Sequence, residues 1–91
     1  MKVILTITPY CTCVGHNATF TKEIISDMMP AIGAEIEDPG LPKDTKKIKT
    51  ITINYKEGKC YADLGREELA TAELYNILVK ALSDNGWKPN D

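Results

Sequence analysis

Two cysteines and the only histidine of the chain lie together in the segment "TPYCTCVGHN". Cys11 and Cys13 are separated by one residue, and His16 follows three residues later. Thiolates suit Cu(I) and Zn(II), and imidazole suits zinc and copper. The spacing predicts a soft-metal site with Cys11 and Cys13 as ligands, and with His16 as an auxiliary ligand or a hydrogen-bonding neighbour.

The same residues also have a redox and a structural interpretation. In extended backbone the Cα atoms of residues i and i+2 lie roughly 6.5–7 Å apart, which is at or beyond the usual limit for a disulfide. The pair closes only if the chain turns at Thr12, so a shared ion is the easier arrangement. The structural alternative is that both cysteines pack as small apolar side chains and that His16 hydrogen-bonds locally.

The third cysteine could in principle complete a Cys₃His set. Cys60, however, alternates with Ala62 and Leu64 on one strand face, which indicates the core. Met1–Thr8 is too short and too alternating for a signal peptide, and no run is long enough to span a membrane. With an odd number of cysteines, we expect a cytoplasmic protein with reduced thiols.

The 91 residues predict a single domain, residues 1–91. The net charge is −2, with 11 basic against 13 acidic residues, so a nucleic-acid partner is not expected. The one dense basic run, Lys43–Lys49, is typical of a solvated loop. No Ser/His/Asp ordering, P-loop or dinucleotide fingerprint occurs, so the chain has no complete catalytic set and we expect no enzymatic activity.

The elements that position the cysteine loop begin with a strand at Lys2–Thr8, which alternates apolar residues and is ended by Pro9. Large apolar residues then recur at every fourth position, which predicts an amphipathic helix. They are Phe20, Ile24, Met28 and Ile32. Pro30 and Gly33 are expected to end this helix.

The second half carries the stronger patterns. "IKTITINYKEGKCYADL" alternates on both sides of Glu57 and Gly58, which predicts a hairpin. A second helix begins between Arg66 and Thr71 and ends at Asn85 and Gly86.

The predicted order is β-α-(β)-β-β-α, an α+β two-layer sandwich with both helices on one side of a sheet. We expect a ferredoxin-like fold, or a compact thioredoxin-like fold if Gly33–Glu37 is a strand. Unpaired edge strands in this sheet leave homodimerisation by strand addition open.

The hairpin "ITINYKEGKCYADL" followed by "TAELYNILVKALSDNGW" resembles the heavy-metal-associated domains of copper chaperones and metal-transporting ATPases. That family also carries cysteines between its first strand and first helix. The resemblance implies a ferredoxin-like fold and soft-metal binding, with Cys11 and Cys13 at the metal-loop positions. The loop "PYCTCVGH" departs from the family's M-x-C-x-x-C motif.

Three functions follow. The first is a small non-enzymatic protein that binds Cu(I) or Zn(II), or presents a reactive thiol pair, at Cys11 and Cys13. The second is a protein-interaction or regulatory module, such as an inhibitor or a mobile-element accessory protein, with structural cysteines. The third is a thioredoxin-like thiol oxidoreductase.

Overall fold

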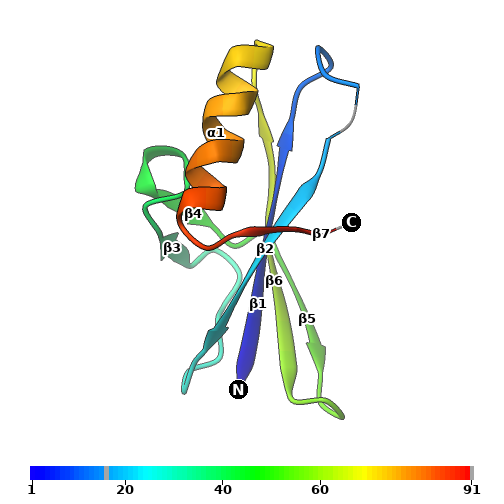
Figure 1. Ribbon diagram of the computed structural model, residues 1–91. Coiled ribbons are helices and arrows are strands. Elements are labelled where there is room, and N and C mark those ends of the chain that lie inside the picture. The colour runs from blue at the N-terminus through cyan, green and yellow to red at the C-terminus, as the bar shows by residue number, and fades with distance from the viewer. Residues whose placement is uncertain (16, 91) are drawn as a thin grey trace.

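The computed structural model describes residues 1–15 and 17–90. Strands dominate these residues, and one α-helix lies near the end of the chain (Figure 1). The elements in chain order are β1 (Lys2–Tyr10), β2 (Thr19–Ile25), β3 (Glu35–Glu37), the 3₁₀ turn η1 (Pro42–Asp44), β4 (Thr45–Lys47), β5 (Thr50–Asn54), β6 (Lys59–Glu68), α1 (Ala72–Asp84) and β7 (Lys88–Asn90).

Five of the strands form one mixed sheet in the order β5-β6-β1-β2-β7. The central strands β1 and β6 are parallel, and the other neighbours are antiparallel. The short strands β3 and β4 form a separate antiparallel pair. Figure 1 shows this pair and α1 on the same side of the long strands.

The core lies between one face of the sheet and these covering elements. Alternate residues of β1 point into it, so Val3, Leu5 and Ile7 are fully buried. Leu78 and Leu82 of α1 join the same apolar cluster. The predicted alternation of the first strand is therefore confirmed, and the opposite face of β1 is half-buried.

The prediction that Pro9 ends the first strand is wrong, because β1 continues to Tyr10. The Tyr10 carbonyl accepts a hydrogen bond from the Leu69 N–H at 2.8 Å, so the backbone of Tyr10 faces the β6 side. Pro9, one residue earlier, faces the β2 side, where pairing has already ended at Ile7 and Phe20. A missing N–H at that place breaks no ladder hydrogen bond.

The predicted first helix is also wrong. Thr19–Ile25 form strand β2, and residues 26–34 are irregular. A four-residue spacing is even, so Phe20 and Ile24 share a face in a strand as well as in a helix. The β-branched residues of "TFTKEII" and six paired positions along β1 select the strand.

The two-helix ferredoxin-like sandwich is therefore contradicted, and so is the compact thioredoxin-like alternative, which needs the same helix. The structure is a mixed five-stranded sheet covered by the single α-helix of the described residues and by the β3–β4 pair.

Several local predictions are confirmed. The hairpin β5–β6 turns through Gly58, whose φ is +67°. Helix α1 begins after Thr71, whose side chain accepts from the Leu74 N–H at 3.2 Å, and it is followed by Gly86 with a φ of +87°. Part of Gly33–Glu37 is a strand, but this strand pairs with β4 and not with the main sheet.

Candidate functional site

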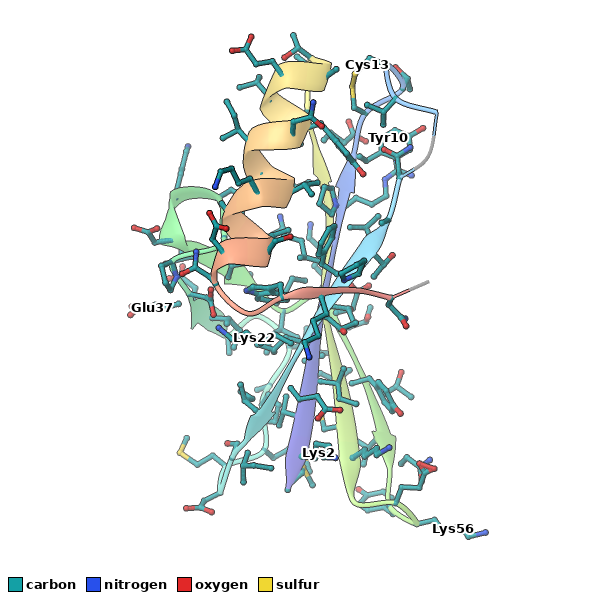
Figure 2. The ribbon with its side chains drawn as sticks, in the orientation of Figure 1. Lys2, Tyr10, Cys13, Lys22, Glu37 and Lys56 are labelled. Atoms are coloured by element: carbon teal, nitrogen blue, oxygen red, sulfur yellow. A yellow bond between two sulfur atoms is a disulfide. The ribbon has the colours of Figure 1, made fainter. Side chains whose placement is uncertain are left out.

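The two cysteines lie on the loop that joins β1 to β2. Figure 2 shows Cys13 at the end of the molecule where α1 begins. Two contacts tie this end together: the Leu69 N–H donates to the Tyr10 carbonyl, and the Ala18 N–H donates to the Tyr75 hydroxyl at 3.4 Å. The loop is thus attached to β6 and to the first turn of the helix.

A tight turn brings the cysteines together. The Val14 N–H donates to the Cys11 carbonyl at 3.3 Å, and the Asn17 side-chain oxygen accepts from the Cys11 N–H at 2.9 Å. The turn shortens the Cα–Cα distance of Cys11 and Cys13 to 5.2 Å, and the two sulfur atoms form a disulfide. The extended backbone on which we judged a disulfide unfavourable does not occur here.

The two sulfurs of the pair differ in their surroundings. Cys11 is 2% exposed, whereas Cys13 is exposed. The N–H of Cys13 points at the Cys11 sulfur, 3.3 Å away. A hydrogen bond from an N–H favours the charged form of a sulfur atom, whereas the burial of Cys11 disfavours it, so the two effects on a Cys11 thiolate oppose each other.

The chain's one arginine lies beside this site. The Arg66 guanidinium carbon is 3.9 Å from the centre of the Tyr10 ring, and Arg66 pairs with Glu68 at 3.1 Å. This stack lies on the residue directly before Cys11, at the end of the sheet where β1 and β6 finish together.

Cys60 lies far from the pair. It is fully buried and free, and it faces Val3 across the β1–β6 ladder. Val3 precedes Tyr10, the last residue of β1, by seven positions, which corresponds to roughly 23 Å of strand, and Cys11 follows Tyr10. The prediction of Cys60 as a core residue is confirmed, and the Cys₃His set is not assembled.

A metal site is not preformed among the described residues. Within residues 1–15 and 17–90, no group of three or more His, Cys, Asp or Glu could hold an ion. The predicted ligand His16 lies outside the described residues, and the sulfurs of Cys11 and Cys13 are bonded to each other. The donors present therefore do not fit a resident soft metal in this oxidised form.

The buried carboxylate of Asp38 lies between β3 and η1 and is not among the predicted site residues. Asp38 is 8% exposed and accepts hydrogen bonds from the Trp87 indole N–H at 3.1 Å and from the Gly40 N–H at 2.9 Å. The Lys22 ammonium pairs with its other oxygen and donates to the Asn85 carbonyl. Asp38 therefore joins β2, the loop before η1 and the end of α1.

The partners of Asp38 determine its charge state. Burial alone would raise the pKa of Asp38, but the hydrogen bonds from Lys22, Gly40 and Trp87, with the Lys22 charge, lower that pKa overall. The contacts with Lys22 and Trp87 link separate parts of the fold, so Asp38 is a structural residue.

The chain matches no family model, no curated protein and no solved structure. In the part of the chain that the structure describes, no helix has both the length and the apolarity to span a membrane.

Proposed function

We propose that Cys11 and Cys13 are a reversible dithiol–disulfide pair through which this small protein exchanges disulfides with thiols of other molecules. The observation that carries the proposal is the unequal exposure of the two bonded cysteines, Cys13 exposed and Cys11 buried. Exchange requires one sulfur that an incoming thiolate can reach and a second that leaves as a stabilised thiolate.

The exchange balances as follows. A thiolate of the partner attacks the Cys13 sulfur, the bond between the two cysteines breaks, and Cys11 leaves as a thiolate. A mixed disulfide now joins the partner to Cys13. A second thiolate of the partner then attacks the partner's first sulfur, which is bonded to Cys13. This step forms a disulfide within the partner and releases Cys13 as a thiolate. The partner has lost two electrons and become a disulfide, and the protein's pair has gained them and takes up two protons from solvent.

The backbone supports this direction of attack. The Cys13 N–H lies 3.3 Å from the Cys11 sulfur, and the Asn17 side chain holds the Cys11 N–H. The exposed Cys13 is the cysteine that an incoming thiolate can reach, so its sulfur forms the mixed disulfide and the Cys11 sulfur leaves.

The small size of the closed loop favours a functional over a stabilising role. Cross-linking residues two positions apart restricts the unfolded chain little, and the chain-entropy relation gives about 1.6 kcal/mol for a three-residue loop. Typical structural disulfides close longer loops and contribute more. The bond between Cys11 and Cys13 is thus weakly coupled to the stability of the fold.

The test is equilibration in glutathione buffers of graded potential, followed by acid quenching, alkylation and intact mass measurement. We expect a two-electron transition that is absent from the Cys11→Ser/Cys13→Ser variant and retained in Cys60→Ala, the matched control. A pair that stays oxidised in the folded protein under strong reductant contradicts the proposal and favours structural cysteines in an interaction module.

The direction of attack is tested separately with the single variants. Cys11→Ser keeps the exposed thiol and is expected to form a mixed disulfide with oxidised glutathione at least about tenfold faster than Cys13→Ser, which keeps the buried one. Equal rates would show that the assignment of Cys13 as the attacked sulfur is wrong.

A second candidate function is soft-metal binding by the reduced pair. The Cα–Cα distance of 5.2 Å keeps the two thiols close enough to share one ion such as Cu(I), a soft metal that thiolates favour. Titration of Cu(I) and Zn(II) into reduced wild type and into Cys11→Ser/Cys13→Ser tests this function, because binding that is unchanged in the variant excludes these ligands.

A further inference from the structure

We propose that two copies of this chain associate through strand β5, which pairs antiparallel with β5 of the second copy about a two-fold axis at Thr52. The two five-stranded sheets then join into one continuous sheet. This inference is independent of the cysteine pair, which lies on the β1–β2 loop.

The two edges of the sheet differ in how they are protected. Strand β7 is three residues long and contains Lys88 and Pro89. A charge, a proline and a short length are the usual devices that stop another strand from pairing at an edge. Strand β5, at the opposite edge, has none of them.

Strand β5 presents a regular and uncharged edge. Its five residues, "TITIN", contain no charge, no proline and no glycine. The ladder with β6 runs without a bulge from Thr50, opposite Asp63, to Asn54, opposite Lys59. Figure 1 shows no other element beyond β5 on its outer side. Every second residue of an edge strand points its N–H and C=O outward, so β5 offers hydrogen-bonding groups to a further strand.

A second copy of the same strand fits this edge without opposing like charges. Thr52 is the midpoint of β5, so a two-fold axis there pairs all five residues of each copy. Ile51 then faces Ile53 of the second copy, and Thr50 faces Asn54 of the second copy. The strand contains no charged residue, so no like charges face each other between the two copies. The flanking Lys49 lies opposite Tyr55 of the second copy, and it therefore does not face another lysine.

The side chains on both faces fit this pairing. Ile51 and Ile53 are only partly buried in one copy and already pack against the apolar core. Across the axis they extend that core into the second copy, and cross-strand pairs of β-branched residues are favourable. On the other face Thr50 and Thr52 are exposed, and the axis sets the two Thr52 hydroxyls opposite each other.

Sedimentation equilibrium under reducing conditions, over low to high micromolar protein, tests the proposal without interference from intermolecular disulfides. We expect wild type to be a concentration-dependent dimer. Thr52→Lys places two lysines directly opposite each other and is expected to weaken the dimer by at least about tenfold, and Thr52→Glu is expected to do the same.

An equimolar mixture of the Thr52→Lys and Thr52→Glu variants is expected to restore the dimer, because opposite charges then meet at the axis. Thr50→Lys is the matched control, since its lysine faces Asn54 of the second copy and leaves the dimer intact. Circular dichroism checks that each variant is folded. A monomeric wild type throughout, a Thr52→Lys dimer of unchanged affinity, or a mixture that fails to associate would each overturn the proposal.

Discussion

At the scale of single residues, Asp38 shows how a buried charge is held in this fold. Its carboxylate accepts from Trp87 and Gly40 and pairs with Lys22, so three separate parts of the chain meet on one side chain. The Lys22 ammonium also lies 6.0 Å from the centre of the Trp87 ring. An amide in this place can still accept from Trp87 and Gly40 through Oδ1, but it leaves the Lys22 ammonium without its counter-charge, which costs more than the pair itself contributes.

We therefore expect Asp38→Asn to lower the free energy of unfolding at neutral pH by about 2–3 kcal/mol. The neighbouring Glu37→Gln is the matched control, because Glu37 is exposed, and it is expected to change stability little. Urea unfolding of both variants measures the difference. Equal stability of the two variants would show that the Asp38 contacts contribute little.

The pH dependence of stability follows from the lowered pKa of Asp38. The folded-state pKa lies below the unfolded value of about 3.8, so the unfolded state binds more protons in this range. The contribution of Asp38 is fully present above that value and is lost as pH falls through the folded pKa. Wild type should lose more stability than Asp38→Asn when urea unfolding is repeated below pH 4, and parallel losses would contradict this assignment.

At the scale of elements, the sequence patterns succeeded where a local signal specifies one conformation. Strand β1 alternates, the hairpin turn carries Gly58 at positive φ, and α1 is bounded by Thr71 and Gly86. The first predicted helix failed because a four-residue spacing fits a strand equally well, and pairing with β1 made the choice. Strand β7 was missed because its three residues form a strand only by pairing with β2.

The candidate site was also predictable only in part, because contacts between residues far apart in the chain determine its geometry. The sequence selected Cys11 and Cys13 by residue type, but the turn that joins them depends on Asn17, which holds the Cys11 N–H. The convergence of Lys22, Asp38 and Trp87 is a tertiary contact between residues far apart in the chain. No spacing rule in the sequence contains that information.

The N-cap of α1 provides a test at this scale. Thr71 accepts from the Leu74 N–H, one of the helix donors that have no partner within the helix. Thr71→Ala is expected to lower the free energy of unfolding by about 1 kcal/mol, whereas Thr71→Ser keeps the cap and should lose only a small part of this. Urea unfolding of the two variants measures this difference in the free energy of unfolding. Equal losses would show that the methyl group of Thr71, and not its hydroxyl, provides the stability.

At the scale of the whole molecule, the core and the cysteine pair are separate parts. The core lies between the sheet, α1 and the segment around η1, and it includes Trp87 and Ile48. The disulfide lies at one end of the molecule, where β1 leaves the sheet. On the proposed function, a change of redox state at this end of the molecule would therefore leave the core in place.

The last prediction follows from this separation. Reduction of the Cys11–Cys13 bond is expected to lower the free energy of unfolding by no more than about 1.6 kcal/mol, the chain-entropy contribution of so short a loop. Amide hydrogen exchange should quicken in residues 11–14, which form the turn, and stay slow in the paired strands β1 and β6. Both effects are measured in the Cys60→Ala variant, in which Cys11 and Cys13 are the only cysteines. Denaturant unfolding and amide hydrogen exchange are compared between its oxidised and reduced forms. If reduction instead unfolds β1 and β6, the bond supports the fold, and a protein that cycles between the two redox states would lose the structure that keeps Cys11 buried and Cys13 exposed.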